Sequence, residues 1–367
     1  MTGLSETVRR LAAARVAPRP AEGPSRLSRL SGFGANPGAL GAWTYIPADL
    51  PSRAPLVVVL HGCTQTAAGY DRGSGWSRLA DEGGFALLFP EQTRANNHNT
   101  CFNWFVPGDT LRGGGEIASI LAMVAHVAAI HDVDPARVYV TGLSAGGAMS
   151  AALLAAAPDV FAGGAIIAGL PSGIASTVPQ AFERMRGQGL PDAETLQRRV
   201  RSASQHDGPW PTLSIWQGDA DRTVDTSNAD AIFRQWRGVH GVGPTPTRSE
   251  AIGAHQRRTW TDSAGRDVIE SVTLSGMGHG TPIGGGDGVA APYMLDVGVS
   301  SSRHVARFWG LSVAAPRIVE PVRPRHDAPL PRSRASAAAP KASNGTSRPP
   351  GVTKTIEDAL RAAGLLR

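Results

Sequence analysis

The sequence predicts an α/β fold in which one mostly parallel central sheet has helices on both faces. Short runs of apolar residues alternate along the chain with longer stretches of helical periodicity, the arrangement that produces βαβ units and a parallel sheet. Of the 367 residues, 41% are hydrophobic and 18% are charged, which excludes a disordered or fibrous chain. This length suits one large domain with tails.

The strands are expected at the apolar runs. Residues 56–60 form an unbroken run of valine and leucine, as in a strand that is buried on both faces. Similar runs predict further strands at residues 85–89, 138–141, 164–168 and 212–217. Two runs on either side of a Ser-Ala-Gly turn predict a hairpin near the sheet edge, at residues 257–261 and 268–274.

Helical periodicity predicts helices between these strands, at residues 116–130, 145–156 and 229–236. Residues 171–211 contain no clear strand pattern, and we expect a helical excursion or lid over the sheet there. Residues 311–350 are rich in proline, alanine and arginine, which predicts a disordered linker. Residues 351–367 have apolar side chains at helical spacing and predict a short amphipathic helix.

The net charge of +6 is carried by the two ends of the chain. The N-terminal segment, residues 1–32, has six arginines and two acidic residues, and residues 311–367 have ten Lys or Arg and four acidic residues. The predicted domain, residues 33–310, therefore carries a net charge of −4. Basic tails on an acidic body argue against a nucleic-acid groove and favour loose contact with an anionic surface or simple solvation.

The termini and the two cysteines indicate in which cellular compartment the protein is expected. No run approaches 18 apolar residues, and the N-terminal residues are polar and arginine-rich. We therefore expect neither a transmembrane helix nor a secretory signal, and a cytoplasmic location. The two cysteines, Cys63 and Cys101, are too few for a disulfide scaffold and do not match zinc-ligand spacing.

A strong local motif is Gly-Leu-Ser-Ala-Gly-Gly at residues 142–147, between a predicted strand and a predicted helix. This is the pattern of a nucleophile elbow, in which a strained turn presents a serine, here Ser144. Glycines two residues to either side prevent a collision of side chains across the turn. The motif in this setting predicts the α/β-hydrolase fold.

A nucleophilic serine needs a histidine as base and a carboxylate that orients the histidine, and in this fold they follow in the order Ser, Asp, His. The loop after residues 212–217 offers Asp221, which we prefer, and Asp219, which could instead bind the loop backbone; Asp225 is a third candidate. His279 lies downstream in a Gly-Met-Gly-His-Gly loop, whose glycines let the backbone carry the imidazole to the serine.

The other histidines fit ordinary structural positions. A predicted helix carries His126 and His131, and we expect surface or loop positions for His98, His206, His240 and His255. Backbone N–H groups must stabilise the negative charge that develops on an acyl oxygen. The candidates are Ala145, directly after the nucleophile, and Cys63, in the loop at residues 61–65 after the first central strand.

These motifs resemble those of the polyhydroxybutyrate (PHB) depolymerase family of serine esterases, whose relatives include feruloyl and acetylxylan esterases. The resemblance rests on residues 60–65, 101–105, 142–147 and 276–280 and spans residues 33–310. It implies Asp221 as the acid, Cys63 as an oxyanion donor, and a disulfide between Cys63 and Cys101.

Tryptophans are candidates for contact with the apolar part of an ester. Trp104 lies on a loop that we expect to be exposed and could make this contact, whereas Trp76 and Trp216 are expected to pack in the core.

The chain differs from the family's secreted depolymerases in having no evident signal peptide and a proline-rich end that is too short for a folded polymer-binding domain. We therefore expect an intracellular member that hydrolyses amorphous PHB granules or short oligomers through an acyl-enzyme on Ser144, without metal or cofactor. One alternative is a feruloyl or acetylxylan-type esterase with the same triad. Another is a non-catalytic granule-associated protein that binds through its basic tail and terminal helix.

Overall fold

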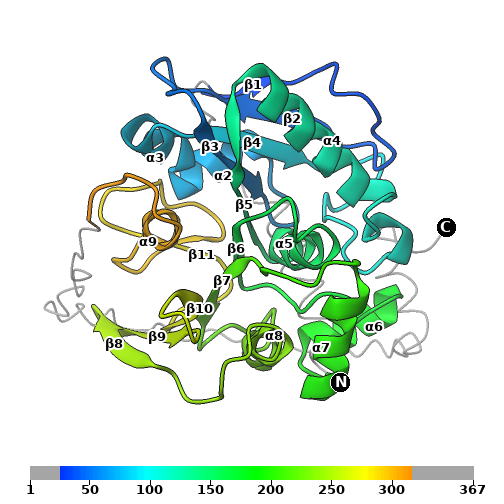
Figure 1. Ribbon diagram of the computed structural model, residues 1–367, viewed down its shortest axis with the longest axis vertical. Helices are drawn as coiled ribbons and strands as arrows, with labels where there is room; N and C mark the ends of the chain where they lie inside the picture. Colours follow the sequence, from blue (N-terminus) through cyan, green and yellow to red (C-terminus); the bar gives the residue numbers. More distant parts are fainter. Residues whose placement is uncertain (1–24, 316–367) are drawn as a thin grey trace, which may run out of the picture.

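The computed structural model describes residues 25–315 (Figure 1). Most of the basic N-terminal segment, nearly all of the predicted linker at residues 311–350 and the predicted helix at residues 351–367 lie outside the described residues. Within the part that is described, no helix combines the length and the hydropathy that a membrane crossing would require.

A ten-stranded sheet forms the centre of the described chain, in the order β1-β2-β4-β3-β5-β6-β7-β10-β9-β8. The strands from β4 to β10 in this order run parallel, and the strands at both edges pair antiparallel. The predicted parallel sheet and hairpin are thereby confirmed. The strands are β1 (Ser28–Arg29), β2 (Gly41–Tyr45), β3 (Ala54–Leu60), β4 (Ala86–Glu91), β5 (Val133–Leu143), β6 (Gly163–Ile167), β7 (Thr212–Gly218), β8 (Arg248–Ile252), β9 (His255–Thr261) and β10 (Asp267–Leu274). A separate small sheet joins β11 (Thr281–Ile283) to β12 (Met294–Asp296).

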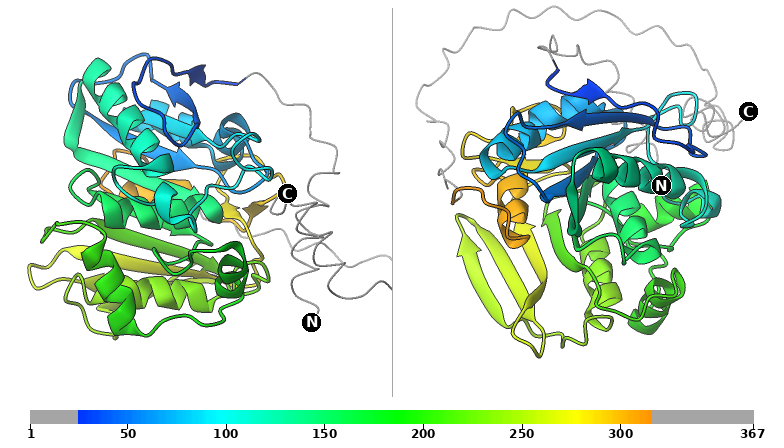
Figure 2. Two further views of the ribbon diagram at one scale, coloured as in Figure 1. Left: turned by 90° about the vertical axis from the view of Figure 1, so that its right-hand side faces the viewer. Right: turned by 45° about the horizontal axis from the view of Figure 1, so that its top comes forward.

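Helices cover both faces of the large sheet, as Figures 1 and 2 show. One face is covered by α4 (Gly115–Ile130), α5 (Ala145–Ala156), α7 (Ala193–Ser202) and α8 (Ser227–Arg237). The other face is covered by α2 (Ala67–Ser74), α3 (Trp76–Gly83) and α9 (Ser301–Phe308). The expected helical excursion between β6 and β7 contains α6 (Val178–Met185) and α7, and η1 (Pro107–Asp109) is a short 3-10 turn.

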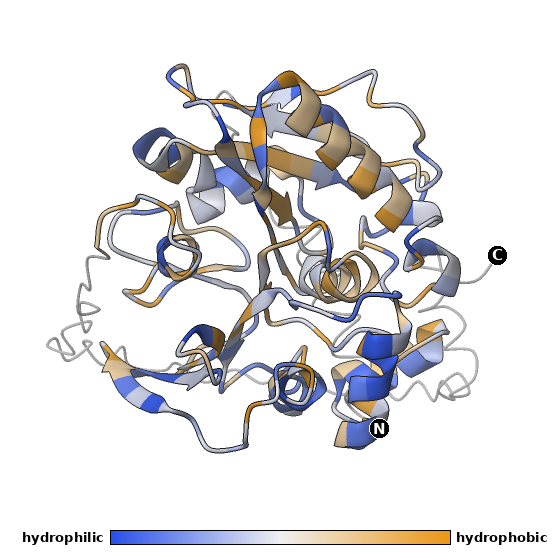
Figure 3. Cartoon of the chain, in the orientation of Figure 1, coloured by the Kyte–Doolittle hydropathy of each residue, from blue (hydrophilic) through white to orange (hydrophobic). Residues whose placement is uncertain are grey.

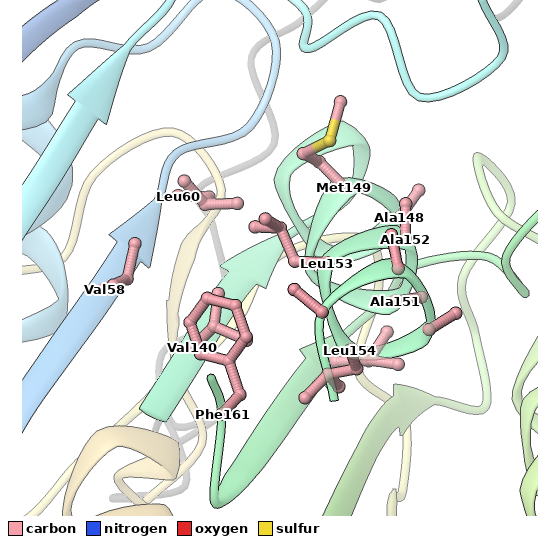
Figure 4. Packing of buried hydrophobic residues seen from close by; sticks show 14 of the residues in the cluster. Val58, Leu60, Val140, Ala148, Met149, Ala151, Ala152, Leu153, Leu154 and Phe161 are labelled. Atoms are coloured by element: carbon pink, nitrogen blue, oxygen red, sulfur yellow. The ribbon is translucent and has the colours of Figure 1, made fainter. Parts of the chain in front are cut away.

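The side chains of β3 show why its sequence is continuously apolar. Val58 and Leu60 pack with the layer of α4 and α5, whereas Val57 and Val59 pack with the layer of α2 and α3, because successive side chains point to opposite faces of a strand. Both faces are therefore buried. Figure 4 shows Leu60 close to Leu153 of α5 in the first of these layers.

The two edge strands of the sheet, β1 and β8, are largely exposed. Four of the five residues of β8 are exposed, and Figure 3 colours much of this strand hydrophilic. An edge strand buries little surface and shows no apolar run, so the sequence did not predict β1 or β8.

The packed body extends beyond the predicted limits of residues 33–310. Leu27 and Leu30 are buried at one end, and Leu311 and Val313 are buried at the other. These side chains join the hydrophobic core on the two faces of the sheet. The composition shift after residue 309 therefore does not mark the end of the packed structure.

The carboxyl ends of the central parallel strands meet along one edge. Leu60 pairs with Gly142, and Gly218 pairs with Leu274. The loops that follow these strand ends carry, in chain order, Cys63, Ser144, Asp221 and His279.

Candidate active site

Ser144 lies on a sharp turn between β5 and α5. Its φ of 58° and ψ of −117° fall outside the regions that L residues prefer. A Cβ atom at Gly142 would lie 2.5 Å from Gly146, and one at Gly146 would lie 2.5 Å from the carbonyl oxygens of Leu60 and His61. Gly142 thus avoids a collision across the turn, as predicted, whereas Gly146 lets the turn approach the end of β3.

Asp221 and His279, 58 residues apart in the sequence, are joined by a hydrogen bond of 2.7 Å between His279 Nδ1 and Asp221 Oδ2. The exposed fractions of the two side chains are 9% for His279 and 0% for Asp221. His279 and Ser144 line the same cavity. The structure thus gathers the three predicted residues at one end of the sheet.

The Asp221 carboxylate accepts hydrogen bonds on both oxygens. Oδ1 accepts from the backbone N–H groups of Thr223 and Val224, at 2.8 and 3.0 Å. Oδ2 accepts from His279 and from Gln217 Nε2, the latter at 3.0 Å. Burial raises the pKa of Asp221, but the attraction to His279 and the hydrogen bonds outweigh burial and hold the pKa below its ordinary value. The carboxylate is charged at neutral pH and fixes the imidazole proton on Nδ1.

Two side chains hold the start of the loop that carries His279. Asp219 Oδ1 accepts the Gly276 N–H at 2.7 Å, which is the backbone-binding role that the sequence offered for this residue. His255 Nδ1 accepts the Ser275 N–H at 3.1 Å. The expectation that His255 lies on the surface or in a loop is wrong: it belongs to β9 and is 6% exposed, because its ring nitrogen bridges the strand to this loop.

The loop after β3 carries Cys63. On either side of it, the Gly62 N–H donates to Gln65 Oε1 in the same loop at 2.8 Å, and the Thr64 N–H donates to the Asn99 carbonyl oxygen at 2.7 Å, which fixes the backbone. Ala145 is the first residue of α5, and N–H groups in a helix's first turn have no acceptor within the helix. Both residues line the cavity with Ser144, so their amides are suitably located candidates for an oxyanion hole.

The buried imidazole of His61 forms hydrogen bonds that hold the backbone of this loop. His61 Nε2 accepts the backbone N–H of Gln92 at 3.1 Å, so the ring proton lies on Nδ1, which donates to the Gly62 carbonyl oxygen at 2.8 Å. Burial lowers the pKa of His61, and the ring is neutral. No sequence motif indicated a role for His61, because its partner Gln92 is 31 residues away.

The side chain of Gln92 extends the network to the next loop. Its Nε2 donates to the Cys101 carbonyl oxygen at 3.0 Å and to Glu116 Oε1 at 2.5 Å. Glu116 Oε2 accepts the Asn103 N–H at 2.9 Å. Burial raises the pKa of Glu116 to about 8. This network holds the segment on which Trp104 lies, and the sequence motifs singled out neither Gln92 nor Glu116.

Cys63 and Cys101 form a disulfide that joins the candidate oxyanion loop to this segment across 38 residues. Cys101→Ser is expected to lower the free energy of unfolding by about 3–4 kcal/mol, because the bridge restricts the unfolded chain. It should also lower kcat by roughly tenfold, because a displaced oxyanion donor is worth up to about 3 kcal/mol. Thermal denaturation and hydrolysis of p-nitrophenyl butyrate measure the two effects.

Treatment of the unsubstituted protein with a phosphine reductant is the control for this substitution. Reduction should reproduce the loss of kcat, and it should not change the Cys101→Ser protein further. A lower melting temperature with an unchanged kcat would mean that the bridge stabilises the fold and does not position the oxyanion loop.

A cavity of about 90 Å³ opens beside Ser144. Apolar side chains form most of its lining: Trp104, Phe105, Leu143, Leu170, Val178, Ala181, Phe182 and Met185. The lining also includes Gln65, Asn97, Asn99 and Thr223. Trp104 is 7% exposed, so the prediction of an exposed loop aromatic is wrong, although its ring does line the cavity. Trp76 and Trp216 are buried in the core, as expected.

The sequence matches the model of the family described as "Esterase PHB depolymerase" over residues 41–257. Ser144 and Asp221 lie inside the matched range, and His279 lies beyond it. The poly(3-hydroxyalkanoate) depolymerase C of Paucimonas lemoignei is 43% identical over 291 residues, which cover 78% of this chain and 70% of that protein.

Two acetylxylan esterases are also similar. That of Coprinopsis cinerea is 32% identical over 283 residues, which cover 75% of each chain. The solved structure of the acetyl xylan esterase from Aspergillus awamori superimposes with a TM-score of 0.64 at 25% identity, and covers 69% of this chain and 93% of that chain.

Proposed function

The chain belongs to the PHB depolymerase family of esterases, and from this premise we propose that it hydrolyses hydroxyalkanoate esters by acyl transfer through Ser144. Members of the family are carboxylic ester hydrolases. The observation that carries the mechanism is the 2.7 Å bond between His279 and a charged Asp221, at a cavity that also contains Ser144 on a strained turn.

In the first step, His279 Nε2 takes the proton of the Ser144 hydroxyl as its oxygen attacks the ester carbonyl carbon. The carbon–oxygen double bond opens to an oxyanion, which accepts hydrogen bonds from the amides of Cys63 and Ala145. As the double bond reforms, the bond to the leaving alcohol breaks, and His279 gives its proton to that oxygen. The product is an acyl group on Ser144 and a free alcohol.

In the second step, water takes the place of the alcohol. His279 accepts a proton from the water as its oxygen attacks the acyl carbon, and returns the proton to Ser144 as the acid leaves. Asp221 remains charged throughout and holds the imidazole in the Nδ1–H tautomer. Each amide of the oxyanion hole contributes roughly 3 kcal/mol in such sites.

Two observations support a hydroxyalkanoate ester as the substrate. The similarity to the P. lemoignei depolymerase, 43% identity, exceeds that to the acetylxylan esterase of C. cinerea, 32%. The cavity is lined mainly by apolar side chains, which suit the hydrocarbon backbone of a polyester. The TM-score of 0.64 to an acetyl xylan esterase makes an acetylated polysaccharide the second candidate.

Product release from amorphous PHB granules, acetylated xylan and methyl ferulate at equal ester concentration tests the assignment. We expect 3-hydroxybutyrate and its oligomers to be released faster than acetate or ferulate. Faster release of acetate or ferulate would overturn the substrate, and no release from any of them would favour a granule-associated protein without activity.

The same granules test a role for the basic end of the chain, residues 316–367, with a net charge of +6. We propose that this segment attaches the protein to the granule surface. A chain that ends at residue 315 keeps the buried Leu311 and Val313, should hydrolyse p-nitrophenyl butyrate normally, and should sediment less with granules. Equal sedimentation would contradict this attachment. The cytoplasmic location stays a prediction.

A further inference from the structure

Tyr293 lies in the cavity that contains Ser144 and His279. It directly precedes β12, and its ring meets the His279 imidazole edge to face, with 6.0 Å between centroids and 78° between planes. No sequence motif singled out this residue. An aromatic ring in contact with the proposed general acid and base is placed where it can touch a substrate.

The backbone fixes this ring relative to His279. The Thr281 N–H donates to the Tyr293 carbonyl oxygen at 2.8 Å. A Cβ atom at Gly280 would lie 2.8 Å from the same oxygen, so the two segments touch. Tyr293 itself has a φ of 65°, a left-handed conformation that is unfavourable for a bulky residue. Such strain persists where the surroundings impose it and is common at ligand sites.

The chemistry of the proposed function tells which part of a substrate lies beside this ring. In acyl transfer, the leaving alcohol takes its proton from the histidine. Its oxygen must therefore approach His279 within hydrogen-bond distance. A side chain that lines the cavity next to the imidazole meets the alcohol half of the ester, whereas the acyl half extends away from His279.

We propose that Tyr293 binds the alcohol half of the ester and thereby sets the preference among leaving groups. This inference rests on the proposed function. The alcohol half of a hydroxyalkanoate ester is itself a hydroxyalkanoate unit, with a methyl group and methylene carbons that can pack against the face of the ring. Tyr293 is a specificity residue in this scheme, and it takes no part in proton transfer.

Two substitutions separate the ring from its backbone. Tyr293→Asn removes the ring but keeps a residue that tolerates a positive φ, and Tyr293→Phe keeps the ring. The first substrate series consists of the butyryl esters of methanol, benzyl alcohol and methyl 3-hydroxybutyrate, so that only the alcohol half varies. The second has one leaving group, p-nitrophenol, with acetyl, butyryl and hexanoyl groups.

Tyr293→Asn should lower kcat/KM for the butyryl ester of methyl 3-hydroxybutyrate by roughly fivefold or more relative to methyl butyrate. The order of kcat/KM among the p-nitrophenyl esters should stay unchanged. Tyr293→Phe should retain the preferences of the unsubstituted protein in both series. Every ester of the first series forms the same butyryl-enzyme. The rate at which water hydrolyses this butyryl-enzyme should therefore not depend on the leaving group in any variant.

Three results would overturn the inference: an equal loss on every ester of both series, which indicates a structural role only; a changed order among acyl chains; and the same loss in Tyr293→Phe, which excludes the ring contact. Ser144→Ala, assayed in parallel, isolates the premise. If Ser144→Ala kept full activity, the proposed function would fail whatever the Tyr293 variants did.

Discussion

Ser144→Ala is expected to lower kcat for p-nitrophenyl butyrate by about 10⁴-fold or more, to near the detection limit. The substitution removes the oxygen that forms the acyl bond, and His279 has no other hydroxyl at the turn to activate. The strained backbone at Ser144, with φ of 58°, depends on the glycines around it and not on the hydroxyl. The melting temperature should therefore change little. Steady-state kinetics and thermal denaturation of the same preparation measure both quantities.

Ser150→Ala is the matched control for this experiment. Ser150 lies on α5, the helix that follows Ser144, is fully buried, and donates its hydroxyl to the Gly146 carbonyl oxygen at 2.8 Å. It does not belong to the lining of the cavity beside Ser144, so its removal should leave kcat close to that of the unsubstituted protein. Activity that survived in Ser144→Ala would require another nucleophile and would end the triad assignment.

The sheet could be predicted from sequence wherever both faces of a strand are buried. Residues 56–60 of β3 are all apolar because each side chain enters one of the two core layers. At the edges this signal disappears. β8 exposes most of its residues, and β5 begins at Val133, before the predicted start, with a stretch that is largely outside the core. Most side chains in these two stretches are not buried, so the stretches lack an apolar run.

The elbow could be predicted because its glycine spacing is local. Gly142, Ser144 and Gly146 are separated by one residue each, and a Cβ atom at Gly142 would collide with Gly146 within that turn. A Cβ atom at Gly146 would instead meet the carbonyl oxygens of Leu60 and His61, a contact that the motif does not reveal. The order Ser, Asp, His then restricted the search for partners to loops after later strands. The fold fixes both the chain order of the triad and the strand ends that carry it, so the partners follow from the position of the serine.

The supports of the site could not be predicted, because they join residues that are distant in sequence. Gln92 reaches His61 and Glu116, and His255 reaches Ser275. A single glutamine or histidine has no periodicity that distinguishes a buried hydrogen bond from an exposed position. The wrong prediction for Trp104 has the same origin. A loop is expected to be exposed, but this loop is held against the core by a disulfide and by the buried carboxyl group of Glu116.

Asp221→Asn is expected to lower kcat by about 10³- to 10⁴-fold with a smaller change in KM. The oxygen of the new amide would remain where two backbone N–H groups point, and its NH₂ group would then face His279 Nδ1. The imidazole must turn to the tautomer with the proton on Nε2, which cannot accept a proton from Ser144. The NH₂ group would also face the side-chain amide of Gln217, which in the unsubstituted protein donates to Asp221 Oδ2.

Asp225→Asn is the matched control, because it removes the same charge from an exposed position in the same loop, and it should retain nearly full activity. The pH dependence of stability gives a second measurement. The pKa of Asp221 is lowered in the folded protein, so its stabilising contribution is fully present above the unfolded value of about 3.9 and is lost as the pH falls through the folded value. The difference in melting temperature between the unsubstituted protein and Asp221→Asn should therefore be larger at pH 7 than below pH of about 4. A difference that grew on acidification, or an Asp225→Asn protein as inactive as Asp221→Asn, would remove Asp221 from its role as the charged partner of His279.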